Sequence, residues 1–199
     1  DLGRVMKMPF EELKLLDYAI NSALAFSNIA LLKNDKAGLI TFAKKVDTIV
    51  GASNKKTHLN TINDALYNIT TKYTDADFGY LYAVIKRKIT QRSLLILYTN
   101  FEHISSLKRQ LPFLKAISKH HLLVVVFFEN TELDSLIKEN AEDLQTIYHK
   151  TIAEKFIYEK KLIVNELHKY GIQTILTTPE NLTVNTINKY LEIKARGLI

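Results

Sequence analysis

Residues 93–102 have the sequence Ser-Leu-Leu-Ile-Leu-Tyr-Thr-Asn-Phe-Glu, in which an unbroken apolar run ends abruptly in polar side chains. A run without alternation is typical of a strand that is buried on both faces of a parallel sheet, with helices covering each face. Ligands of open α/β sheets bind beyond the carboxyl ends of such strands. The stretch therefore predicts a central strand, with Thr99, Asn100 and Glu102 where a binding site is expected.

A second apolar run, Leu-Leu-Val-Val-Val-Phe-Phe, occupies residues 122–128. We expect the two runs to form adjacent parallel strands, with Leu94 to Leu97 and Leu123 to Val126 nearly fully buried between covering layers. Glu129 and Asn130 follow the second run, so they should lie beside Asn100 at the same edge of the sheet.

The rest of the chain alternates between helical and strand patterns. Strands are expected at residues 37–43 and 46–50, as a hairpin, and at 172–176. Helices are expected at 10–33 (opened by Pro9), 56–69, 78–89 (capped by Asp77), 104–118 (interrupted near Pro112), 131–140, 143–170 (closed by Gly171) and 183–196. The predicted fold is a three-layer α/β/α sandwich, Rossmann-like, with a mostly parallel sheet and one antiparallel edge strand, in a single domain of residues 1–199.

The composition excludes several classes of protein. The chain has no Cys, which argues against a disulfide-stapled secreted domain and excludes a zinc site made of thiolates. No stretch is expected to cross a bilayer, and the first residues lack a signal-peptide pattern.

The net charge of +6 arises from 27 basic and 21 acidic residues. The excess is local, because the segment between residues 81 and 121 contains Glu102 as its only acid against Lys86, Arg87, Lys88, Arg92, Lys108, Arg109, Lys115 and Lys119. We expect Lys86, Arg87, Lys108, Arg109 and Lys115 to form a basic surface away from Asn100. The simplest interpretation is that this surface only faces solvent. The alternative is that it binds anionic lipid or nucleic acid.

In a parallel sheet each crossover helix is preceded by a strand, but no strand precedes the first helix of this sequence. The missing strand would end at Asp1, so we expect the natural polypeptide to continue upstream of this residue. The sheet should then show a gap or an unpaired strand edge between residues 37–43 and 93–99.

Short motifs occur in a fixed order along nearly the whole chain. They are Asp1-x-Gly3-Arg4-x-Met6, Leu16-Asp17-Tyr18-Ala19-Ile20-Asn21, Asp35-x-x-Gly38-Leu39-Ile40-x-Phe42, Asp77-Phe78, Arg92-Ser93-Leu94 with Tyr98-Thr99-Asn100, and Asn-Lys-Tyr-Leu-Glu-Ile-Lys-Ala-Arg-Gly at 188–197. Together they resemble the bacterial domain-of-unknown-function family fifty-eight. The resemblance implies a von Willebrand factor A-like fold with strand order 3-2-1-4-5-6, in which the missing strand is the first.

The resemblance also implies a setting. Members of the family are typically bacterial proteins with transmembrane helices upstream, often encoded near a MoxR-type AAA+ ATPase, and their activity is largely undefined. It thus implies a non-enzymatic protein-interaction module on the cytoplasmic side of the bacterial inner membrane, tethered by upstream segments. Its protein partner would be the MoxR-type ATPase.

Relatives of this family carry a metal-ion-dependent adhesion site built from D-x-S-x-S, a Thr and a further Asp. Asp1 matches the first Asp, whereas Gly3 and Val5 stand where the two serines would be. Asp77, or Thr74, takes the second-loop position. Asn100 replaces the last Asp, so the implied metal ligands are Asp1, Asp77 and Asn100, with both hydroxyls lost.

Such a site is degenerate, and the expected cofactor is none, or weakly bound Mg²⁺. We expect one of the two Asp carboxylates to accept a hydrogen bond from Thr99, Asn100 or a backbone amide instead of holding a cation. The same residues and their neighbours would form a partner-binding rim consisting of Asp1, Gly3, Arg4, Thr74, Asp77, Asn100 and Glu102.

Two alternatives belong to other functional classes. One is a metal-dependent hydrolase that uses Asp1, Asp77 and Glu102. The other is binding of nucleic acid or anionic lipid through residues 86–119. Between these two ligands, we expect an anionic membrane surface and do not expect nucleic acid. The sequence has no P-loop, no dinucleotide fingerprint and no nucleophile elbow. No catalytic residue is therefore assigned.

Overall fold

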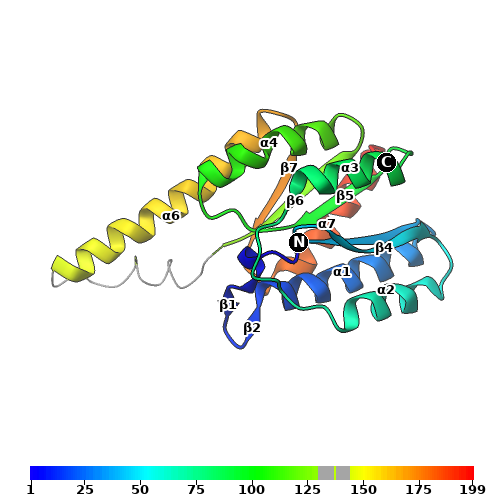
Figure 1. The fold of residues 1–199 in the computed structure, drawn as a ribbon, viewed down its shortest axis with the longest axis horizontal. Coiled ribbons are helices and arrows are strands. Elements are labelled where there is room, and N and C mark those ends of the chain that lie inside the picture. Colours follow the sequence, from blue (N-terminus) through cyan, green and yellow to red (C-terminus); the bar gives the residue numbers. More distant parts are fainter. Residues whose placement is uncertain (130–136, 138–143) are drawn as a thin grey trace.

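The central sheet contains three parallel strands in the order β5 (Leu94–Tyr98), β6 (Leu122–Phe128) and β7 (Gln173–Thr177). The computed structural model describes residues 1–129, 137 and 144–199. The fold is a mixed α/β fold in which helices flank this sheet and small antiparallel hairpins accompany it (Figure 1).

The pairing of β5 with β6 confirms the predicted neighbours. Leu94 lies opposite Leu122 and Tyr98 opposite Val126 in a parallel register. The side chains of Leu123 to Val126 are 0–3% exposed, as predicted. The prediction for β5 is wrong in part, because only Leu97 is buried and Leu94 to Ile96 are half-buried. The physical reason is that β5 is an edge strand of its sheet, so only one side of it is covered by a neighbouring strand.

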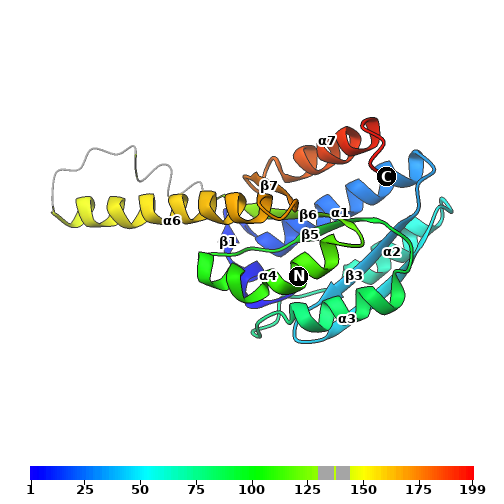
Figure 2. The ribbon, with the colours of Figure 1, turned by 90° about the horizontal axis from the view of Figure 1, so that it is seen from above.

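Helices cover both faces of the sheet (Figure 2). One face packs against α3 (Phe78–Lys88), α4 (Ile104–Ser118) and α6 (Leu144–His168), and the other against α1 (Leu15–Leu32) and α7 (Leu182–Ala195). Alternate residues of β6 enter the two cores, since Val125 belongs to the first and Val124 to the second.

The predicted hairpin forms from β3 (Ala37–Phe42) and β4 (Val46–Ser53), and α2 (His58–Tyr67) packs beside it. It is a separate two-stranded sheet, so the expected antiparallel edge strand of one continuous sheet is not formed. Among the described residues no ladder joins β3 to β5. The predicted gap between these strands is confirmed.

Residues 1 and 2 lie at the carboxyl end of this gap. The Asp1 amino nitrogen donates a hydrogen bond to the Tyr98 carbonyl (3.2 Å), and the Leu2 amide donates to the Phe42 carbonyl (2.7 Å). The two residues thus connect the ends of β5 and β3. Burial lowers the pKa of the Asp1 α-amino group to about 5.

The region before α1 differs from the prediction. A 3-10 turn, η1 (Arg4–Lys7), precedes a small hairpin of β1 (Pro9–Phe10) and β2 (Leu13–Lys14), so Pro9 does not open the helix. The helix begins at Leu15, where the Asp17 carboxylate accepts a hydrogen bond from the Lys14 amide (2.9 Å).

Other predicted elements agree within a few residues, with one further correction. Helix α4 continues through Pro112 without interruption. A proline removes one helical hydrogen bond, and the buried side chains of Leu111, Leu114 and Ile117 hold this helix on the sheet. The helix predicted at 131–140 lies outside the described residues.

Helix α1 is the described helix that is long and apolar enough to cross a bilayer, with 18 residues and a mean hydropathy of 1.4. This differs from the sequence-based expectation. In the fold, its residues Ala30 and Leu31 pack in a cluster with Ile62, Leu66 and Tyr190. The core helix of a globular domain meets the same length and hydropathy criteria, so α1 is weak grounds for a membrane span.

Helix α6 has 25 residues, and its first half extends beyond the sheet (Figures 1 and 2). Ile147, Tyr148 and Tyr158 are exposed on it, whereas Ile163 and Leu167 near its end are fully buried. Ile163 and Leu167 belong to the core cluster on one face of the sheet, and Ala153 in the first half is also fully buried.

The gap between β3 and β5 leads to a testable prediction. Extending the chain before Asp1 by six β-branched residues should raise the melting temperature by several degrees, because a strand there can pair with both open edges and replaces a buried amine by a peptide bond. A Gly/Ser extension of the same length is the control for calorimetry. Equal melting temperatures for the two extensions would contradict the prediction.

Candidate functional site

The candidate site lies where the carboxyl ends of β5 and β6 meet residues 1–8. Thr99 and Asn100 directly follow β5 and are buried, with 1% and 3% of their surface exposed. The Thr99 amide donates to the Val126 carbonyl (3.2 Å), which continues the parallel ladder by one bond. The polar end of the first apolar run is therefore held by the sheet itself.

Each oxygen of the Asp1 carboxylate accepts a hydrogen bond from a protein donor. Its Oδ1 accepts a hydrogen bond from the Gly3 amide (2.7 Å), and its Oδ2 accepts one from the Thr99 hydroxyl (2.7 Å). This confirms the prediction that Asp1 takes a hydrogen bond from Thr99 or a backbone amide.

Gly3 is required by close packing. A Cβ atom on this residue would lie 2.9 Å from Asp1 Oδ1 and 3.2 Å from the Ala76 backbone nitrogen. No side chain fits at this position without movement of its neighbours. The space beside Gly3 is thus filled by approaching protein atoms.

Asp77 serves as the cap of α3. Its Oδ1 accepts a hydrogen bond from the Tyr80 amide (2.8 Å), and its own amide donates to the Ala43 carbonyl (2.9 Å). The predicted capping role is confirmed.

Exposed charges surround the buried centre. Arg4 Nε lies 2.7 Å from Asp75 Oδ1, and both side chains are more than 60% exposed. The Arg4 amide also donates to the Thr74 carbonyl (3.1 Å). Of the predicted rim, Arg4, Thr74, Asp77 and Glu102 are exposed, Asp1 is half-buried, and Gly3 and Asn100 are buried.

Lys160 is a site residue that is absent from the sequence-based prediction. Its Nζ, on α6, donates a hydrogen bond to Asn100 Oδ1. Burial lowers the pKa of Lys160 to about 8, and the Glu102 carboxylate opposes this shift. Asn100 therefore has its side-chain oxygen occupied by an amine.

A signal for Lys160 does exist in the sequence. On a helix, residues three and four positions apart share a face. Lys160 is spaced in this way from Phe156 and Ile157 on one side and from Ile163 and Val164 on the other. A lysine in the middle of an apolar helical stripe is expected to be buried and to need a partner.

A cavity of about 340 Å³ opens beside Lys160. Most of its wall is apolar, and the polar groups in it are Asn100, Glu102, His103, Glu129, Lys160 and Lys161. His103 Nδ1 lies 3.2 Å from Glu159 Oε2, which also accepts a hydrogen bond from the Ile104 amide (3.1 Å) at the start of α4. His121 is buried at the start of β6, at the end of that strand away from this cavity.

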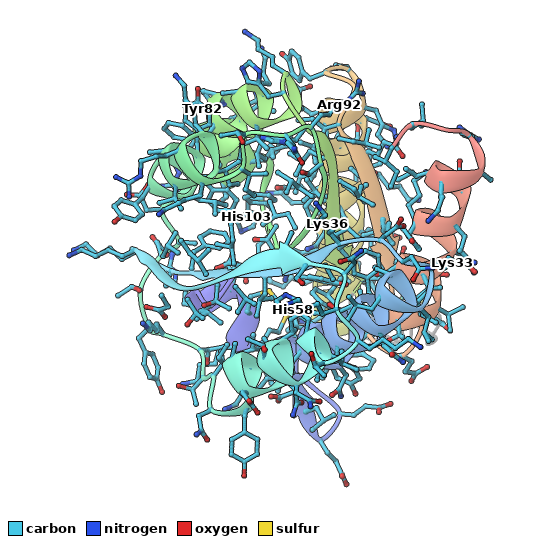
Figure 3. The ribbon with its side chains drawn as sticks, turned by 90° about the vertical axis from the view of Figure 1, so that its right-hand side faces the viewer. Lys33, Lys36, His58, Tyr82, Arg92 and His103 are labelled. Atoms are coloured by element: carbon cyan, nitrogen blue, oxygen red, sulfur yellow. The ribbon has the colours of Figure 1, made fainter. Side chains whose placement is uncertain are left out.

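The basic surface lies elsewhere, on the neighbouring helices α3 and α4. Lys86, Arg87, Lys108 and Arg109 are exposed there, and Lys115 Nζ lies 3.9 Å from the centre of the Tyr170 ring. Figure 3 shows Tyr82 and Arg92 on this side, opposite Lys33 and His58.

The proposed metal ligands are thus each bound to protein groups. Asp1 is engaged by Gly3 and Thr99, Asp77 by Tyr80, and Asn100 by Lys160. Within residues 1–129 and 144–199 no three His, Asp or Glu side chains are grouped as they would be around a metal ion.

Comparison with known proteins gives no further guidance. No model of a protein family matches the chain, and no curated protein matches it in sequence. The site is interpreted from its geometry.

Substituting Gly3 tests this geometry. Gly3→Ala should lower the free energy of unfolding by about 1–3 kcal/mol, because the new methyl group displaces the Asp1 carboxylate from its donors. Urea denaturation measures the change. Gly51→Ala, where a Cβ meets nothing within 4 Å, is the matched control and should have little effect. Equal losses in both variants would show that the packing around Gly3 is loose.

Thermal melting with millimolar Mg²⁺ or Mn²⁺ tests the metal site. We expect the melting temperature to change by less than about 1 °C, since the ligand oxygens already have donors, whereas a site filled at a hundredfold excess over Kd would gain about 2.7 kcal/mol. Asp1→Ala is the control. A rise of several degrees that disappears in this variant would refute the degenerate site and favour the metal-dependent hydrolase.

Proposed function

We propose that this chain is a von Willebrand factor A-like domain of the bacterial domain-of-unknown-function family fifty-eight, and that it acts as a non-enzymatic protein-interaction module. The topology supports this assignment. The order β5, β6, β7 corresponds to strands four to six of the order 3-2-1-4-5-6, and the hairpin of β3 and β4 corresponds to strands two and three. The gap between β3 and β5 corresponds to the first strand.

The observation that carries the proposal is the state of the Asp1 carboxylate. Both of its oxygens accept hydrogen bonds of 2.7 Å from Gly3 and Thr99. A carboxylate held in this way stabilises the loop, and a metal ion would have only the remaining lone pairs of its two oxygens. Two of the three residues of the hydrolase alternative, Asp1 and Asp77, thus hold the local structure, whereas Glu102 is exposed. The structural use of the two Asp carboxylates favours recognition over catalysis.

The rim around this centre has a charge pattern that fits a basic partner. Its exposed ionisable groups are Arg4, Asp77 and Glu102, and Asp75, which lies beside the rim, pairs with Arg4, so acids outnumber the single base. Opposite potentials accelerate association and select the partner. We infer that the rim binds a basic protein surface, and the resemblance points to a MoxR-type AAA+ ATPase.

The proposed location is the cytoplasmic face of the bacterial inner membrane. The basic surface of Lys86, Arg87, Lys108 and Arg109 supports it, because each basic residue near an anionic leaflet contributes about 1 kcal/mol of attraction. Lys86 and Arg87 lie at the end of α3, whereas the rim residue Asp77 caps its start, so this helix separates the two groups of charges along its length.

Site-specific photo-crosslinking tests the rim. A photoreactive amino acid at Thr74, which is exposed, should crosslink to the MoxR-type ATPase encoded in the same genome. One at Tyr67, which is 80% exposed on α2, should not. Asp75→Lys should weaken the crosslink at Thr74 at least about tenfold by reversing a rim charge.

The matched control is Asp64→Lys, which makes the same charge change at an exposed position on α2. Equal crosslinking from Tyr67, or equal weakening by both charge reversals, would contradict the rim as the contact surface. Phosphoester turnover that needs a metal ion and is lost in Asp1→Ala would replace the proposal with the hydrolase.

A further inference from the structure

The cavity beside α6 is a candidate site for a small molecule. We propose that it binds a small apolar aldehyde or ketone, which Lys160 Nζ holds as a reversible imine. This inference does not rest on the proposed interaction function, because the cavity lies between α6 and residues 8–15 and shares only Asn100 and Glu102 with the rim.

The size and wall of the cavity set the class of ligand. Its volume of about 340 Å³ is at the lower end of the range for small-molecule sites, about 300–1,000 Å³. Phe10, Leu15, Phe128, Phe156 and Leu176 contribute apolar wall. A compact ligand with one aromatic ring or a short acyl chain fits this description.

The charges of the cavity favour a neutral ligand over an anion. Lys160 and Lys161 are balanced by Glu102 and Glu129 in the same wall, so the four groups have no net charge. Lys160 also feels the Glu102 carboxylate directly. A ligand carboxylate would have to compete with that acid, whereas a carbonyl group would not.

The amine of Lys160 is prepared to act as a nucleophile. Lysine reacts only in its neutral form, and desolvation in an apolar pocket increases that form. With a pKa of about 8, roughly a fifth of Lys160 is neutral at pH 7.4, about 200-fold more than for an ordinary lysine. The hydrogen bond to Asn100 Oδ1 fixes the position of Nζ.

The bonds and protons of the reaction balance without another reactant. The neutral Nζ adds to the carbonyl carbon, and one of its protons passes to the oxygen, which gives a carbinolamine. Protonation of the hydroxyl group breaks the carbon–oxygen bond and releases water, and a C=N bond remains. His103, which is in the same wall, can supply this proton in its protonated form, and the added charge then stays on the nitrogen of the protonated imine. Hydrolysis reverses each step.

Reductive trapping tests the proposal. The full chain is incubated at pH 7.4 with benzaldehyde and sodium cyanoborohydride, which reduces an imine to a stable secondary amine, and each modified lysine is located by peptide mass spectrometry. We expect Lys160 to be labelled at least about tenfold faster than any other lysine, with a rate that rises with pH around a midpoint near 8. Lys161, its neighbour in the chain and in the cavity wall, is the internal control.

Two variants separate the cavity from the amine. Phe128→Trp should slow labelling of Lys160 by filling the cavity, while Lys155→Arg, at an exposed position on α6 outside the cavity wall, should leave it unchanged. Labelling of Lys160 no faster than that of Lys161, or labelling unaffected by Phe128→Trp, would overturn the proposal. Protection of Lys160 by benzoate as strong as that by an equal concentration of the ketone acetophenone would also overturn it, in favour of an anion site.

Discussion

The burial of β6 is the constraint on which the rest of the structure depends. Val124, Val125 and Val126 have no exposed surface, because parallel strands lie on both edges of β6 and helices on both faces. Parallel neighbours can be joined only by crossover connections, so α4 returns the chain from β5 to β6 and α6 lies between β6 and β7. All three strands then end at the same edge of the sheet, which is why Asn100, Glu129 and Thr177 lie near one another.

The open side of β5 explains what surrounds it. A strand with an unpaired edge must satisfy its backbone polar groups in other ways, and the carbonyl of Tyr98 does so through Asp1. The Tyr98 hydroxyl lies 3.0 Å from Ser22 Oγ on α1, and burial raises the pKa of Tyr98 to about 12. The end of β5 is thus held by a backbone hydrogen bond to Asp1 and by a side-chain hydrogen bond to α1, although one edge of the strand has no neighbouring strand.

Local signals made much of the fold predictable. The continuous apolar run of β6, the Asp77 cap and Gly171, which has a φ of 71° just beyond α6, depend on neighbouring residues only. The two-residue strands β1 and β2 have no period to detect, so Pro9 was misassigned to a helix. The half-exposure of β5 depends on which strand lies beside it, a tertiary property that an apolar run does not contain.

The residues of the candidate site were also only partly predictable from the sequence. Asn100 was placed from the end of the apolar run, whereas Asp1 and Asp77 were proposed as metal ligands from the family resemblance. Lys160 was missed because its contact with Asn100 spans 60 residues of chain. Its position in the apolar stripe of α6 predicted burial, but the identity of its partner depends on how α6 docks on the sheet.

The shape of α6 has a mechanical consequence for that contact. A helix rises 1.5 Å per residue, so the exposed Ile147 lies about 24 Å along the axis from the buried Ile163, and Lys160 about 4.5 Å from it. If the helix turns as a stiff rod about its anchored half, a displacement at the exposed end is about fivefold smaller at Lys160. A swing of about 5 Å at the tip moves the amine by about 1 Å. Under such a motion the amine would stay close to Asn100, because Lys160 lies near the anchored end of α6.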